Sequence, residues 1–122
     1  MDELITVLEA QYGRSLPRDY ADALRDGRLA ACEGKRPPTL PGWAPEMSYP
    51  LTFEPEIVSE SFDEQSGYLP LARFLTDDGD QLHDMEDFVA LDAESGVVVL
   101  CDHDGDIRSV ATSVSAFIAM LR

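Results

Sequence analysis

The chain has 122 residues, of which 44% are hydrophobic and 27% charged, and we expect residues 1–122 to form a single folded domain. Its net charge of −15 at pH 7 repels nucleic acids and anionic membrane surfaces, and it would speed encounter with a basic protein. An acidic surface also serves solubility alone, and that alternative stays open. No apolar run approaches the roughly 18 residues that cross a membrane, and the acidic N-terminus lacks the basic start of a signal peptide. We therefore expect a cytoplasmic protein.

Two helices are predicted in the N-terminal part of the chain. In residues 2–12 the apolar side chains recur close to helical spacing, and a glycine suited to end a helix follows them. A second helix is predicted in "LPRDYADALRDG" (residues 16–27). Pro17 suits the first helical position, Asp19 places negative charge in the first turn, and Gly27 follows the last turn.

The structure of residues 28–58 is the least predictable. Within it, "EGKRPPTLPGWAPEMSYP" (residues 33–50) holds five of the eight prolines, so this segment is expected to be a loop or a short edge strand rather than a long helix or a central strand. From residue 49 onward the pattern favours strands. "YPLTFEPEIV" (residues 49–58) predicts one or two short strands, and "GYLPLARFL" (residues 67–75) predicts another with a proline near its start.

The clearest local signal is the segment "DFVALDAESGVVVLCD". Two apolar runs, Phe88–Leu91 and Val97–Cys101, flank a turn-forming "DAESG" and predict an antiparallel hairpin. The second run is apolar throughout, which places it inside the sheet with both faces covered. We expect Cys101 to be mostly buried and Asp102 to lie at the strand end.

A final helix is predicted in "TSVSAFIAMLR", where apolar residues at i, i+3, i+4 and i+7 share one face, with Ser113 or Thr112 as the cap. The expected fold is therefore an α+β domain. An antiparallel or mixed β-sheet is packed by N-terminal helices and a C-terminal helix.

The negative charge is concentrated in one part of the sequence. Residues 60–106 hold fourteen acidic residues and one basic residue, Arg73, which gives a net charge of −13. Two acidic loops in this stretch bracket the predicted hairpin, so their carboxylates are expected to gather near one another at sheet edges and bind a partner. The candidate partner-binding residues are Asp77, Asp78, Asp80, Asp84, Glu86, Asp87, Asp102, Asp104 and Asp106.

The acidic turn "DHDGD" (residues 102–106) admits two chemical interpretations, and the sequence opposes both. Asp102, Asp104 and Asp106 occupy positions 1, 3 and 5 of a calcium loop, but the glycine falls at position 4 and Ser113 at position 12. An EF-hand needs glycine at position 6 and glutamate at position 12. The turn also resembles the haloacid-dehalogenase nucleophile motif. That motif opens a large α/β domain, whereas only sixteen residues follow here, and the usual Thr or Ser after the glycine is replaced by Asp106.

No other chemical constellation is found in the sequence. His83 and His103 do not form a ligand-spaced pair, and Cys32 and Cys101 are not placed to complete a zinc site with them. The two cysteines are expected to be reduced thiols. Neither a nucleophile elbow nor a phosphate loop is present. We therefore expect no catalytic residue, no cofactor and no metal site.

Three segments together resemble the SUKH superfamily, the Smi/Knr-like group. "LPRDYADAL" is similar to that family's Leu-Pro-x-Asp-Tyr helix opening. "YLPLARFLTDDGDQLHDMEDFVALDAESGVVVLCDHDGD" is similar to its second signature, a Leu-Pro strand, an acidic loop and a hairpin. "VATSVSAFIAML" is similar to its closing helix. The resemblance covers most of the chain and leaves residues 28–58 uncovered.

The resemblance implies a SUKH-like fold and a non-enzymatic binding protein. Bacterial members of the superfamily are immunity proteins that neutralise polymorphic toxins, often nucleases, and a nuclease that binds phosphate tends to be basic. The resemblance therefore implies that the acidic surface binds a basic toxin domain. The alternative is a general interaction or regulatory module of the same fold without a toxin partner.

Overall fold

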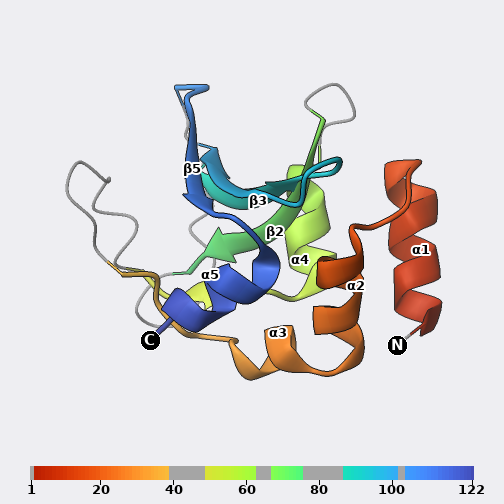
Figure 1. Cartoon of the computed structure of the whole chain (residues 1–122), viewed down its shortest axis with the longest axis horizontal. Helices are drawn as coiled ribbons and strands as arrows, with labels where there is room; N and C mark the ends of the chain where they lie inside the picture. The colour runs from red at the N-terminus through yellow and green to blue at the C-terminus, as the bar shows by residue number, and fades with distance from the viewer. Residues whose placement is uncertain (1, 39–48, 63–66, 76–86, 102–103) are drawn as a thin grey trace.

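The computed structural model describes residues 2–38, 49–62, 67–75, 87–101 and 104–122 (Figure 1). The helices are α1 (Asp2–Tyr12), α2 (Arg18–Arg25), α3 (Arg28–Ala31), α4 (Pro55–Val58) and α5 (Val114–Met120), with a 3-10 turn η2 (Ser59–Ser61) after α4. The strands are β1 (Leu51–Thr52), β2 (Tyr68–Phe74), β3 (Phe88–Asp92), β4 (Val98–Cys101) and β5 (Ile107–Ala111). The predicted α+β class is confirmed.

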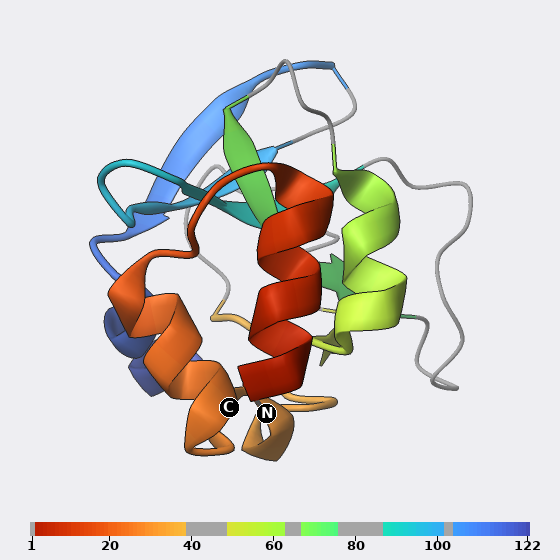
Figure 2. The ribbon, with the colours of Figure 1, turned by 90° about the vertical axis from the view of Figure 1, so that its right-hand side faces the viewer.

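The five described strands form one sheet in the order β1-β2-β3-β4-β5, and every neighbouring pair is antiparallel. The sheet is therefore antiparallel rather than mixed in the described part of the chain. The helices gather on one side of it, with α1, α2 and α4 standing in front of the strands in Figure 2. Each strand pairs with the strand that precedes or follows it in the sequence, and the connection between β1 and β2 contains α4 and η2.

The core lies between the sheet and the helices. Alternate residues of β3 and β4, such as Val89, Leu91 and Val98, pack in one cluster with side chains from α1, α2 and α5. In β2 a register shift between Pro70 and Ala72 adds one residue to the strand. A bulge of this kind breaks the strict alternation of faces. Leu71 and Ala72, although adjacent in sequence, therefore both join the core cluster.

The two predicted N-terminal helices are confirmed. Gly13 has a φ of +69°, a left-handed conformation that glycine adopts without a steric penalty, and α1 ends just before it. Pro17 precedes α2 as its N-cap residue instead of occupying the first helical position. Gly27, with a φ of +78°, separates α2 from α3.

The structure corrects the prediction for residues 49–58. Leu51–Thr52 does form a short edge strand, but Pro55–Val58 is helical rather than extended. A proline at the first helical position lacks an N–H that would have no intrahelical acceptor there, and its φ is already helical. Four residues are too few to show a helical period. Helix α3 also has only four residues and was not predicted. Residues 39–48 lie outside the described part of the chain.

The predicted hairpin is confirmed. Phe88 pairs with Cys101 and Leu91 with Val98, while the Asp92 carboxylate accepts the backbone N–H of Glu94 at 2.8 Å and so holds the turn. Val98, Val99 and Leu100 are all buried, as expected for an interior strand, whereas Cys101 is half-buried rather than mostly buried. Asp102 lies outside the described residues.

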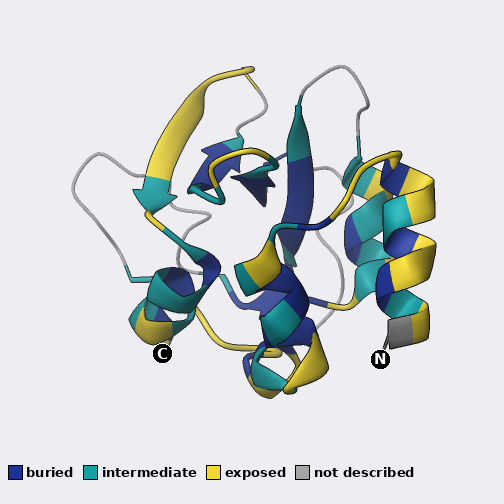
Figure 3. Cartoon of the chain, turned by 45° about the vertical axis from the view of Figure 1, so that its right-hand side comes forward, coloured by how far each residue is buried: buried dark blue, intermediate teal, exposed yellow. Residues whose placement is uncertain are grey.

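The C-terminal helix is confirmed, and the structure distinguishes its two candidate caps. The hydroxyl of Ser113 accepts the Ala116 N–H at 3.0 Å, so Ser113 is the N-cap. Strand β5 was not predicted, because its residues are mostly exposed and show no apolar alternation. Figure 3 shows β5 largely exposed beside strands that are buried.

Candidate functional site

Three of the predicted partner-binding residues lie at one end of the sheet. Asp87 immediately precedes β3, and Phe88 at the start of β3 pairs with Cys101 at the end of β4. Cys101 in turn pairs with Ile107, the first residue of β5. The β4–β5 turn, which carries Asp104 and Asp106, therefore projects from the sheet end at which β3 begins.

These three aspartates differ in exposure. Asp104 and Asp106 are exposed on either side of Gly105, whose φ of +87° lets the chain reverse direction between β4 and β5. Asp87 is only 3% exposed, so it does not present its carboxylate on the surface. Two of these three aspartates are therefore exposed, and the prediction that Asp87 lies on a binding surface is wrong.

The other predicted partner-binding residues lie outside the described part of the chain. The described chain does show where the acidic segment 76–86 is attached. Arg73 near the end of β2 pairs with Phe88 at the start of β3, so the chain enters and leaves this segment at the sheet end that carries the β4–β5 turn. The residues concerned are Asp77, Asp78, Asp80, Asp84, Glu86 and Asp102.

An aspartate of the "LPRDYADAL" segment has a structural role in the fold. The Asp19 carboxylate accepts the Ser115 backbone N–H at 2.8 Å and the Ser115 hydroxyl at 2.6 Å. These bonds join α2 to the first turn of α5, where an unpaired backbone N–H needs an acceptor and negative charge is favoured. Burial alone would raise the pKa of Asp19, but the bonds from Ser115 and the charge of Arg28 hold that pKa below its usual value.

The neighbouring residues of this segment are structural as well. The Leu16 N–H donates to the Glu9 carboxylate at 2.9 Å, which ties α1 to the start of α2, and Tyr20 is buried in the core. Arg28 donates to the Asp26 carboxylate and to the Ser115 hydroxyl, each at 2.8 Å. Through Leu16 and Asp19 the segment therefore connects α1, α2 and α5.

The buried groups with nucleophilic atoms are kept in their neutral forms. Burial raises the pKa of Tyr12 to about 12, and it also raises the pKa values of Tyr20 and of the Cys32 thiol. A nucleophilic cysteine needs a lowered pKa, so Cys32 has the character of a core residue. Among the described residues, no group of three or more His, Cys, Asp and Glu residues is placed to hold a metal ion.

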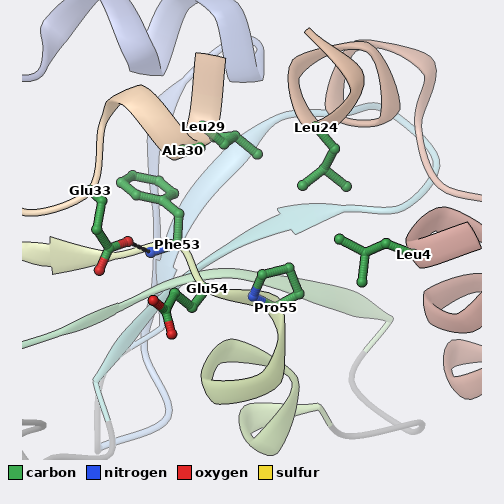
Figure 4. Close-up of a pocket in the computed structure, with 8 residues that line it drawn as sticks. All are labelled: Leu4, Leu24, Leu29, Ala30, Glu33, Phe53, Glu54 and Pro55. Carbon is green, nitrogen blue, oxygen red and sulfur yellow. Dashed lines mark hydrogen bonds between the residues drawn. The ribbon is translucent and has the colours of Figure 1, made fainter. Parts of the chain in front are cut away.

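Sequence reasoning missed a pocket on the helical side of the molecule. The pocket has a volume of about 200 Å³. Leu24 of α2 and Leu29 of α3 line it at the top of Figure 4, Leu4 of α1 at the right, Phe53 at the left and Pro55 at the bottom. These side chains come from segments far apart in the sequence, so only the folded chain brings them together.

No protein-family model, no curated protein and no solved structure matches this chain. In the part of the chain that the structure describes, no helix is both long enough and apolar enough to cross a membrane.

Proposed function

We propose that this protein is a non-enzymatic, cytoplasmic immunity protein with a SUKH-like fold that binds and neutralises a basic bacterial toxin domain through its acidic surface. The observation that carries the proposal is the placement of charge. Residues 60–106 have a net charge of −13. Within this stretch, Asp104 and Asp106 are exposed in the β4–β5 turn, at the sheet end at which β3 begins. A concentrated negative field steers a basic partner and orients it on approach.

The scaffold beneath these carboxylates is suited to binding. The β4–β5 turn joins two paired strands, and β4 is buried between β3 and β5. Exposed charges on a rigid scaffold lose little conformational freedom when a partner docks. The three segments that resemble the SUKH superfamily support the same function. A toxin that degrades nucleic acid has a basic surface for its substrate, and an acidic protein covering that surface would block it.

The experiment is to co-express the protein with the product of the neighbouring gene, where a toxin of this kind would be encoded. We expect the wild-type protein to protect growth and to co-purify with the toxin domain. The double variant Asp104→Lys, Asp106→Lys reverses the exposed charge and should weaken both protection and binding. The matched control is Glu94→Lys, in the exposed β3–β4 turn at the opposite sheet end, which should retain both.

Two outcomes would contradict the proposal. One is a neighbouring gene product that is toxic but is neither bound nor neutralised. The other is a complex that forms equally well with the Asp104 and Asp106 charges reversed. A partner that binds through the acidic end but is not toxic would instead support the interaction module of the same fold.

A further inference from the structure

The pocket beside Leu4 continues into a second hollow on the same side of the molecule. This hollow has a volume of about 310 Å³, and it lies between one face of α1 and the start of α4. Leu4 and Pro55 line both hollows. Val7, which is 60% exposed, lies in the second one. We call this continuous surface the α1–α4 groove, and Figure 2 shows the two helices side by side.

The groove has a firm apolar floor. Phe53 is 5% exposed, and its ring centroid lies 6.4 Å from that of Phe117 in the centre of the core. Leu24 and Leu29 are also core residues. The floor is therefore fixed by the packing of the domain, so a partner would find the hollow already formed.

The groove consists of two connected hollows, a form that suits apolar side chains spaced along a peptide. The hollows measure about 200 and 310 Å³. Each is suited to one or two leucine-sized side chains. An amphipathic segment that lays spaced apolar residues into such a groove is a recurring mode of peptide recognition.

The charged residues that line the groove in the described part of the chain are all glutamates. Glu33 and Glu54 line the first hollow and Glu3 and Glu56 line the second, and none of the described lining residues is Lys, Arg or His. The Glu33 carboxylate accepts the Phe53 N–H at 2.7 Å, which fixes one negative charge at the pocket edge (Figure 4). Charge complementarity therefore selects a partner with lysine or arginine beside its apolar residues.

We propose that the α1–α4 groove binds a basic amphipathic segment of a partner protein, with leucine-like side chains in the two hollows and lysine or arginine side chains at the glutamate rim. This interaction is separate from the proposed toxin contact, which lies at the β4–β5 sheet end. It does not depend on whether a toxin exists.

The test uses a synthetic peptide of three Leu-Ala-Lys-Lys repeats with blocked ends. Two matched peptides replace every lysine with glutamate or every leucine with glutamine. Binding to the full-length protein is followed by backbone amide NMR shifts and by a titration. We expect the Leu/Lys peptide to shift amides of α1 and of residues 53–59, and we expect both matched peptides to bind at least tenfold more weakly.

Protein variants distinguish the groove from a general attraction to an acidic protein. Val7→Gln changes no charge and should lower the affinity for the Leu/Lys peptide several-fold. Ala10→Gln, at another exposed position of α1 outside the groove, should leave that affinity unchanged. Glu54→Gln should weaken binding about two- to fivefold, as expected for one exposed ion pair. Glu94→Gln removes the same charge at the β3–β4 turn and should have no effect.

The proposal is overturned if Val7→Gln and Ala10→Gln bind the Leu/Lys peptide equally, or if the peptide with glutamine in place of leucine binds as well. Shifts confined to the sheet end that carries Asp104 would also overturn it. None of these results bears on toxin neutralisation, because that function is tested with different variants.

Discussion

Asp19 at the α2–α5 junction and the two described aspartates of the β4–β5 turn have different surroundings in the same acidic protein. Asp19 directs its carboxylate at the backbone of another helix, where it accepts two hydrogen bonds from Ser115. Asp104 and Asp106 are exposed beyond the ends of two strands. The first carboxylate connects two helices, and the other two belong to exposed residues of a turn.

The difference shows that net charge alone does not reveal which acidic residues are functional. Asp19 and Asp92 both accept backbone N–H groups of their own chain, and such charge-assisted bonds stabilise the folded state. Neighbouring exposed carboxylates repel one another and stabilise it little. Removing an acid should therefore lower stability at the junction and leave it nearly unchanged at the turn.

The largest effect is expected for Asp19→Ala. The substitution removes the acceptor of both Ser115 bonds at the start of α5, and we expect the free energy of unfolding to fall by about 2 kcal/mol. Urea denaturation followed by circular dichroism measures it. Asp19→Asn, which retains a carbonyl acceptor, should lose less. Equal stability of Asp19→Ala and wild type would show that this carboxylate does not hold the two helices together.

A smaller loss is expected at the cap of the same helix. Ser113→Ala removes the hydroxyl that accepts the Ala116 N–H and should lower the free energy of unfolding by about 1 kcal/mol. Thr112→Ala is the matched control at the adjacent exposed position, and its effect should stay within about 0.5 kcal/mol. If both variants lost the same amount, the helix would not depend on Ser113 as its cap.

The sequence predicted those parts of the fold in which neighbouring residues carry the information. The hairpin and the first, second and last helices were predicted because their apolar spacing and turn residues are local. Strand β5 was missed because only its pairing with β4 makes it a strand. Residues 49–58 were predicted to hold one or two short strands; one of them is β1, and α4 was missed because four residues show no helical period. The sequence predicted Asp19 in the first turn of a helix but not its bonds from Ser115, which lies 96 residues away.

The two candidate sites also differ in how far the sequence alone predicts them. The acidic stretch was visible as composition, and the strand register then placed Asp104 and Asp106 at one sheet end. The α1–α4 groove was not visible, because Leu4, Leu29 and Phe53 come from three separate segments and meet only in the folded chain. Sequence charge thus indicates a kind of partner, whereas the shape of a binding surface depends on long-range packing.

Acid should remove the contribution of Asp19 to stability. The folded pKa of Asp19 lies below its unfolded value, which is about 3.9. Its contribution to stability is therefore fully present above that value and is lost as pH falls through the lower folded pKa. The stability difference between wild type and Asp19→Ala should shrink below about pH 4. Denaturation curves between pH 7 and pH 2.5 test this, and a difference that grew on acidification would contradict it.

The smallest effect on stability is expected for Asp104→Asn combined with Asp106→Asn. Both side chains are exposed, so the free energy of unfolding should change by no more than about 0.5 kcal/mol. Relief of repulsion within the acidic stretch should raise it slightly at low salt. The same variant should associate more slowly with a basic partner and show a flatter dependence on salt, because exposed charges act mainly on the association rate. Stopped-flow association from about 50 to 300 mM salt, over which the Debye length falls from roughly 14 to 6 Å, measures both quantities. A large loss of stability would place these aspartates with Asp19, and an unchanged salt dependence would leave them as solvated residues outside the interface.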